Sequence, residues 1–260
     1  TLSTVNVGNN LNINIDAGTD DTASLDVSAA TITAGATITV DGQGTNDSLL
    51  ATNAANTWII TGSNAGNFNN GTETINFTDF GNITGGSNTD SFNFTSGTIA
   101  NAVNGGSGTV NDTLTYAGGS AAAVTLTATG TVDGFKGNST SLGSFDNINI
   151  LTGSGNNDTL TGSTAGGTFT VQAVNDTCVS GGQTLNFTAI ENLAGNTGND
   201  IFNVNQVRTV NINTGAAGTN AVNVNQNLTG NIAGGAGDDT VTLTGTVNGN
   251  ITDTGGTNTF

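Results

Sequence analysis

The chain has 260 residues and a formal net charge of −17, with 40 Gly and no Pro, His or Met. Its two basic residues are Lys136 and Arg208, which makes nucleic acid a poor partner, because phosphate binding needs clusters of Lys and Arg. Strong helix formers are scarce, apolar residues are never spaced as in a helix, and no apolar run approaches the roughly 18 residues of a membrane span, which argues against all-α, α/β and membrane-spanning classes.

The first 60 residues alternate apolar with polar side chains. Leu11, Ile13 and Ile15 follow this pattern, which returns in the segment 37–40. Such alternation over four to eight residues is typical of a half-buried strand. The run Trp-Ile-Ile at 58–60 predicts a more fully buried strand, and the Asn- and Gly-rich residues 62–71 predict a loop.

A longer module then appears three times with identical internal offsets. Its copies are Phe77, Phe80, Ile83, Gly85, Asp90 and Phe92; Phe145, Ile148, Leu151, Gly153, Asp158 and Leu160; and Phe187, Ile190, Leu193, Gly195, Asp200 and Phe202. Each copy predicts a short strand, a Gly turn and an Asp just before the next strand. Between copies, the segment 135–142 predicts a surface loop that carries Lys136.

The repeats become short and uniform after residue 193, with a period of about 19–20 residues. The residues expected to form the core there are Leu193, Phe202, Ile212, Val222, Ile232, Val241, Ile251 and Phe260. One rung of this length cannot bury its apolar side chains alone, whereas rungs stacked about 4.8 Å apart pair their backbones and close a narrow core.

The sequence therefore predicts an all-β fold, a parallel β-helix (β-solenoid) that forms a single domain over residues 1–260. Rungs are expected to be less regular, with loop excursions, in 1–192 and uniform in 193–260, and the chain is expected to be a fragment of a longer protein. Disorder and a β-sandwich are the structural alternatives. A disordered chain has no need of apolar columns, and a sandwich has no need to keep the same offsets three times.

Gly-Asp turns are the candidate metal sites. Residues 234–242 match the nonapeptide G-G-x-G-x-D-x-U-x, in which backbone carbonyls and the Asp carboxylate bind Ca²⁺. This match makes Asp238 and Asp239 candidate ligands, a near match adds Asp90, and a copy with an insertion adds Asp112. Ca²⁺ is the one candidate cofactor, and the alternative is that each Asp is an ordinary turn residue.

The segment 192–202, Asn-Leu-Ala-Gly-Asn-Thr-Gly-Asn-Asp-Ile-Phe, and the segments at Gly105 and Gly234 resemble a known kind of repeat. They are similar to the Gly/Asn/Thr-rich arrays of giant secreted bacterial surface adhesins, which are filamentous-haemagglutinin-like, and to RTX-like repeats. The resemblance implies secretion to the cell surface, a β-solenoid and a role in surface attachment or extracellular scaffolding. Perfect nonapeptides are not consecutive here, which departs from the RTX pattern of successive copies.

The expected function is that of an extracellular structural or adhesive β-solenoid, part of a bacterial surface filament or adhesin stalk. Open solenoid ends expose unpaired strand edges, so self-association into filaments or with neighbouring repeats is the expected partnership. Surface glycans are a further candidate partner. The first alternative is a calcium-stabilised repeat module that binds carbohydrate or ice. Ice binding is suggested by the Thr-Ile-Thr runs at 31–33 and 37–39 and by Thr-Val-Thr at 240–242.

A polysaccharide-acting enzyme is the remaining alternative, but no catalytic residue is predicted and the chain is not expected to be an enzyme. The sequence has no His for acid–base chemistry, and Asp pairs such as Asp20-Asp21 are sequence neighbours that would point apart in a strand. Cys178, the single cysteine, is expected to be a small, semi-apolar residue with no role in chemistry.

Overall fold

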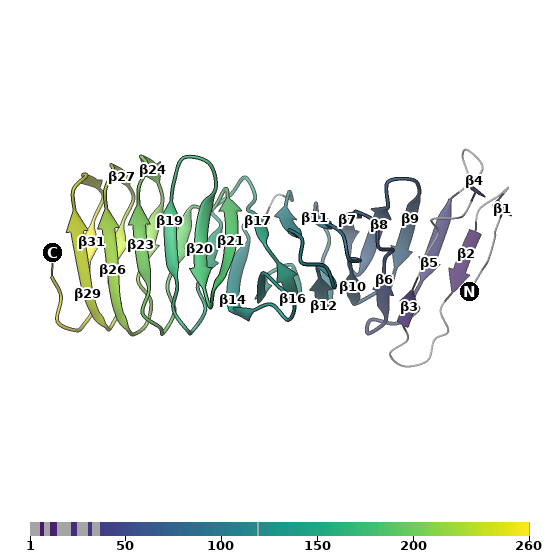
Figure 1. Cartoon of the computed structure of the whole chain (residues 1–260), viewed down its shortest axis with the longest axis horizontal. Coiled ribbons are helices and arrows are strands. Elements are labelled where there is room, and N and C mark those ends of the chain that lie inside the picture. Colours follow the sequence, from purple (N-terminus) through teal and green to yellow (C-terminus); the bar gives the residue numbers. More distant parts are fainter. Residues whose placement is uncertain are drawn as a thin grey trace. The chain divides into compact units, whose positions relative to one another are not determined.

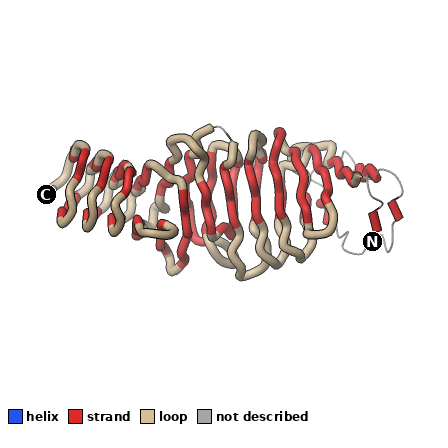
Figure 2. The backbone as a smooth tube through the Cα atoms, turned by 90° about the horizontal axis from the view of Figure 1, so that it is seen from above, coloured by secondary structure: helices blue, strands red, loops and turns tan. Residues whose placement is uncertain are grey.

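The computed structural model describes residues 6–7, 11–14, 22–24, 31–32, 37–118 and 120–259, and this part of the chain consists of strands and turns without a helix (Figures 1 and 2). The all-β prediction is confirmed. Accordingly, the described residues contain no helix long and apolar enough to cross a membrane. The expectations for Ile15 and Phe260 fall outside the described residues.

The chain divides into two compact units, and each is described by itself. The first comprises residues 1–119 and 141–148, and the second comprises 120–140 and 149–260. The predicted change from less regular to uniform rungs, at residue 193, therefore falls inside the second unit.

In the first unit, most strands lie in two largely parallel sheets. The larger runs in the order β2 (Leu11–Asn14), β5 (Ile38–Asp41), β9 (Thr74–Thr78), β8 (Ala65–Asn69), β7 (Thr57–Gly62), β11 (Ser91–Phe94) and β13 (Thr113–Tyr116). The second runs β3 (Thr22–Ser24), β6 (Ser48–Leu50), β10 (Asn82–Thr84), β12 (Ile99–Asn104) and β16 (Leu142–Ile148). A separate parallel pair joins β1 (Asn6–Val7) and β4 (Thr31–Ile32).

The prediction of a loop at residues 62–71 is wrong. This segment contains β8, which pairs antiparallel with both β7 and β9 and so lies inside the larger sheet. The physical reason is Phe68, which is fully buried and packs on Trp58 with ring centroids 4.5 Å apart. A Cβ on Gly66 would lie 2.1 Å from the Ile59 carbonyl oxygen. Gly66 is therefore required because β7 and β8 approach closely, and it does not mark a loop.

The second unit contains two long sheets and one short one. The first runs β15 (Phe135–Ser139), β14 (Ala123–Thr129), β18 (Thr159–Thr161), β22 (Asn192–Ala194), β25 (Asn211–Asn213), β28 (Ile232–Ala233) and β31 (Ile251–Thr252). The next runs β17 (Ile150–Thr152), β21 (Gln183–Thr188), β20 (Asp176–Ser180), β19 (Thr168–Val171), β23 (Ile201–Val204), β26 (Thr219–Val224) and β29 (Asp238–Leu243). The short sheet runs β24 (Arg208–Thr209), β27 (Leu228–Thr229) and β30 (Val247–Asn248).

Residues 135–142 are also not the surface loop that the sequence predicted. β15 pairs antiparallel with β14, and Phe135 is fully buried while Lys136 is half-buried. The alternation of Phe135 and Gly137 toward the interior is that of a strand. The sequence does not reveal this strand, because Phe135 is its one large apolar residue and is followed by Lys, Gly, Asn and Ser.

In the uniform region, strands at equivalent positions pair parallel and in register. Leu193 pairs with Ile212, Ile212 with Ile232, and Ile232 with Ile251. Hydrogen bonds between the neighbouring Asn residues follow the same steps of 19, 20 and 19 residues. The buried members of the expected core are Leu193, Phe202, Ile212, Val222, Ile232 and Val241. Ile251, in the last strand of its sheet, is only half-buried.

Candidate functional site

The Gly-Asp turns are the recurring polar feature of the chain. In each, an Asp carboxylate accepts a hydrogen bond from the backbone N–H four residues earlier: Gly86 to Asp90 (2.8 Å), Ser154 to Asp158, Asn196 to Asp200 (3.0 Å) and Gly235 to Asp239 (3.1 Å). All four Asp side chains are buried. A short acceptor side chain that bonds its own backbone in this way closes a tight turn without a helix or strand partner.

The Gly that precedes each Asp by five residues is required by crowding. A Cβ on Gly153 would lie 1.8 Å from the Ala189 carbonyl oxygen, and one on Gly195 would lie 2.1 Å from the Thr214 carbonyl oxygen and 2.6 Å from Asp200 Oδ2. The backbone just after a neighbouring strand, at Ala189 or Thr214, and the turn's own carboxylate occupy the space that any side chain would need. The Gly-to-Asp offset read from the sequence is therefore a steric rule.

The second carboxylate oxygen reaches a different segment of the chain. Asp90 Oδ1 accepts from both the backbone N–H (2.9 Å) and the side-chain amide (2.7 Å) of Asn56. Asp200 Oδ1 accepts from the Gly167 N–H at 2.8 Å. Because each Asp accepts from its own turn and from an adjacent segment, it ties the two together.

In the second unit these turn side chains form a ladder from one Gly-Asp turn to the next. The backbone N–H of Asp200 donates to Asn220 Oδ1 (2.8 Å), the Asn220 amide donates to Asp239 Oδ1 (3.0 Å), and the Asp239 N–H donates to Asn258 Oδ1 (2.7 Å). Asn alternates with Asp along this ladder, so the Asn220 side chain lies between Asp200 and Asp239. Sequence analysis missed the two Asn residues, although their spacing of about 20 residues from the flanking Asp could have identified them.

The predicted calcium ligands occupy two different environments. Asp90, Asp112 and Asp239 are buried in the turns, whereas Asp238 is exposed and accepts from the Thr257 N–H at 2.7 Å. The structure brings Asp90 and Asp112 together, because the Asp90 N–H donates to Asp112 Oδ1 at 2.7 Å. Among the described residues, no group of three or more His, Cys, Asp or Glu side chains is arranged to hold a metal ion. Calcium binding at these residues stays a prediction.

Burial gives three carboxyl groups unusual titration behaviour. Burial raises the pKa of Asp90 and of Asp200 above the ordinary Asp value, and hydrogen bonds from neighbouring N–H groups oppose this rise without cancelling it. The pKa of Asp176 is raised for the same reason, against the opposing effects of the Gln172 N–H and the Arg208 charge.

These shifts predict that the fold becomes more stable as the solution is acidified below neutral pH. A carboxyl whose pKa is raised on folding stabilises the protein fully below its unfolded value, and that contribution is lost as pH rises through the folded value. We expect the melting temperature to rise as the pH is lowered from neutral toward about 4, the ordinary pKa of Asp. Differential scanning calorimetry measures it, and Asp90→Asn with Asp200→Asn should flatten the dependence. A melting temperature that falls over this range would contradict the assignment.

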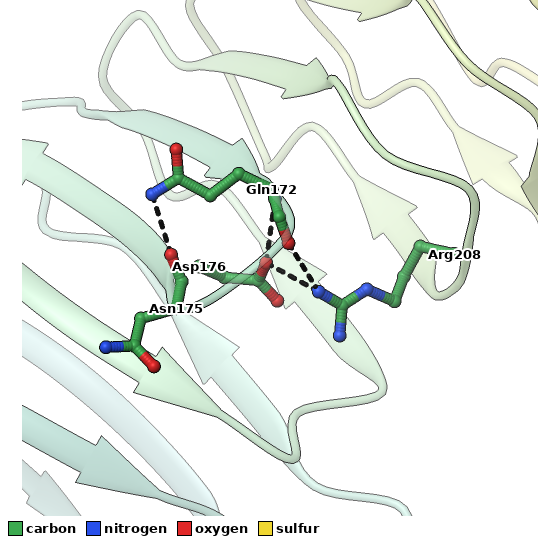
Figure 3. A network of polar contacts seen from close by, with 4 residues as sticks. All are labelled: Gln172, Asn175, Asp176 and Arg208. Atoms are coloured by element: carbon green, nitrogen blue, oxygen red, sulfur yellow. Dashed lines mark hydrogen bonds and ion pairs between the residues drawn. The ribbon is translucent and has the colours of Figure 1, made fainter.

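Arg208 forms an ion pair with Asp176 in the second unit (Figure 3). Its Nη2 donates to Asp176 Oδ1 at 2.8 Å and to the Gln172 carbonyl oxygen at 3.0 Å. The Gln172 N–H also donates to Asp176 Oδ1, and the Gln172 side-chain amide donates to the Asn175 carbonyl oxygen. Arg208 thus fixes the turn between β19 and β20 to β24, and sequence spacing gave no sign of this link.

Cys178 lies in β20, is fully buried, and has its pKa raised to about 12 by burial and by the charge of Asp200. Because the thiolate is the reactive form, the native thiol should be inert. We expect an aromatic disulfide reagent at pH 8 to label less than about one tenth of the protein in the time that labels it fully in guanidinium chloride. Equal labelling rates in both conditions would show that β20 is open.

Comparison with protein-family models, with curated proteins and with solved structures found no match for this chain.

Proposed function

We propose that this chain is a β-solenoid segment that serves as an extracellular structural or adhesive element of a bacterial surface filament or adhesin stalk. The observation that carries the proposal is the in-register column Leu193, Ile212, Ile232 and Ile251. A repeating unit of this kind suits a long scaffold, because each rung contacts only its neighbours. The extracellular and bacterial parts rest on the resemblance of residues 192–202 to adhesin repeats.

The order of the strands supports a closed coil in the uniform region. Residues 192–248 place successive strands in the same three sheets in the same order three times, as β22-β23-β24, β25-β26-β27 and β28-β29-β30. Each full set of three strands is one rung in this interpretation. The buried side chains of the three sheets would then form one continuous core.

The chemistry of the Gly-Asp turns supports a structural role. Asp90, Asp158, Asp200 and Asp239 accept hydrogen bonds from N–H groups of the chain itself and are buried. The hydrogen bonds to these carboxylates hold the turns in place, since a buried acceptor that lost its donors would carry a large desolvation cost.

Electron microscopy of the purified chain at high concentration tests the filament part. We expect end-to-end or lateral assemblies whose number grows with protein concentration, because strand edges and repeating faces can pair with another copy. Dispersed single particles at every concentration would count against assembly as the mode of action.

A calcium-stabilised module is the second candidate, and Asp253 favours it. Its Oδ1 is buried and has no hydrogen-bond partner. A Cβ on Gly234 would lie 2.5 Å from this oxygen and 3.0 Å from Asp239 Oδ2. Two carboxylate oxygens thus border the same small space in the segment that matches the nonapeptide, and an oxygen-rich site of this kind suits Ca²⁺.

Thermal melting with millimolar Ca²⁺ and with a chelator separates the two candidates. If Ca²⁺ binds the folded chain, a free Ca²⁺ concentration of 100 times the dissociation constant stabilises the fold by about 2.7 kcal/mol. Asp253→Asn should then abolish the shift in melting temperature. Identical melting curves in both solutions would remove the calcium candidate and leave the structural one.

A further inference from the structure

One face of the second unit carries no charge over six adjacent strands, in the sheet order β21-β20-β19-β23-β26-β29. Two rows of outward side chains cross these strands in register. The first row is Thr184, Val179, Thr168, Ile201, Ala221 and Thr240, and the second is Asn186, Thr177, Thr170, Asn203, Asn223 and Thr242. We call these twelve residues the uncharged face. Asp238 lies one row beyond it on the edge strand β29.

The uncharged face exposes two large aliphatic side chains close together. Val179 is 42% exposed and Ile201 is 40% exposed, and Thr168 alone separates them in the first row. In the second row the Asn223 amide donates to Asn203 Oδ1 at 2.9 Å, so these two polar groups already satisfy part of their hydrogen bonding. Covering the face would bury the aliphatic surface of Val179 and Ile201 without desolvating a charge.

We propose that the uncharged face is the contact surface for a second copy of this chain, which packs sheet against sheet. This inference rests on the proposed structural role and names the surface that would serve it. A chain of net charge −17 repels its own copies, and a face without carboxylates is where two copies can meet without desolvating a charge.

The repeat itself provides the match between two copies. Rows of side chains on one copy recur at the strand spacing of about 4.8 Å, and a second copy has the same spacing, so β-branched side chains can interdigitate along several strands. Sheets that pack face to face in this way lie about 10 Å apart. A partner with another period would lose this register after a few strands.

The size of the face makes the contact weak. Six strands and two side-chain rows cover about 400 Å² per copy, from the strand spacing and the rise per residue. A stable complex usually buries about 800 Å² per partner. We therefore expect reversible association at high protein concentration. It should strengthen with added salt, which screens repulsion between the acidic copies.

Sedimentation velocity of the full chain between roughly 20 and 500 mM NaCl measures this association over a range where screening changes strongly. Ile201→Glu should weaken self-association by at least about tenfold, because it buries a carboxylate in the contact. Thr252→Glu adds the same charge at an exposed position of β31 and should leave association unchanged. Ile201→Thr keeps a β-branched residue and should associate with intermediate strength. Melting curves of the variants show whether each of them is folded.

Three results would overturn the inference. Association that Ile201→Glu leaves intact would place the contact elsewhere, while the structural role would stand. A chain that stays monomeric but sediments with an insoluble neutral polysaccharide, and loses this with Ile201→Glu, would give the face a glycan ligand and support adhesion. A chain that neither associates nor binds the polysaccharide would remove the face as a contact surface. Electron microscopy under the same conditions would then decide whether assembly through strand ends remains.

Discussion

Replacement of Ile232 by Ala is expected to lower the free energy of unfolding by about 3–4 kcal/mol, the cost of removing a fully buried branched side chain and leaving a cavity. Ile232 is 0% exposed and pairs with Ile212 on one side and Ile251 on the other. The cavity would open between two neighbouring strands that cannot close on it without breaking register. Chemical denaturation with linear extrapolation measures the change.

Ile201 is the matched control for this substitution, because it is an Ile on the outward side of β23. Ile201→Ala should cost no more than about 1 kcal/mol, since a surface-exposed strand position loses only part of its apolar contact. Equal destabilisation by the two substitutions would show that Ile232 does not lie in a packed core.

Gly153→Ala is expected to destabilise the second unit by about 3 kcal/mol or more, in the range of severe backbone conflicts. The added Cβ would lie 1.8 Å from the Ala189 carbonyl oxygen and 2.7 Å from Asp158 Oδ2. Ala189, which directly follows β21, would have to move away, and this would weaken the hydrogen bond that the Gly153 N–H donates to the Thr188 carbonyl oxygen.

Gly155, two residues further along the same turn, provides the control. A Cβ there would have no atom within 4 Å, so Gly155→Ala should change the stability by no more than about 1 kcal/mol. Thermal melting of both variants compares them directly. Similar melting temperatures for the two would refute the steric account of the Gly-to-Asp offset.

The features that the sequence predicted correctly are those set by local repetition. The alternation of apolar Ile38 and Val40 with polar residues predicted a strand, which is β5. The equal offsets of Asp90, Asp158 and Asp200 within the three repeated modules predicted equivalent turns. These signals survive because a parallel in-register stack puts identical residues in identical surroundings. The same logic pointed to Leu193, Ile212 and Ile232, which are buried and paired in one column.

The antiparallel strands β8 and β15 could not be read in the same way. Each has one buried Phe, Phe68 or Phe135, among Gly, Asn and other polar residues, so alternation is too weak to see. Each forms an antiparallel hairpin with the strand just before it in the chain, β7 or β14, which interrupts the parallel repeat and leaves no trace in its period. The link from Arg208 to Asp176 was hidden for a different reason, because it joins residues 32 positions apart.

The most direct test of the account is methyl cross-relaxation in a sample labelled only at isoleucine δ1 methyl groups. If the rungs stack in register, Ile232 should show cross-peaks to both Ile212 and Ile251, and Ile212→Val should remove the first without affecting the second. A folded chain with resolved isoleucine signals and no cross-peak between Ile212 and Ile232 would contradict the stacked arrangement on which the proposed scaffold depends.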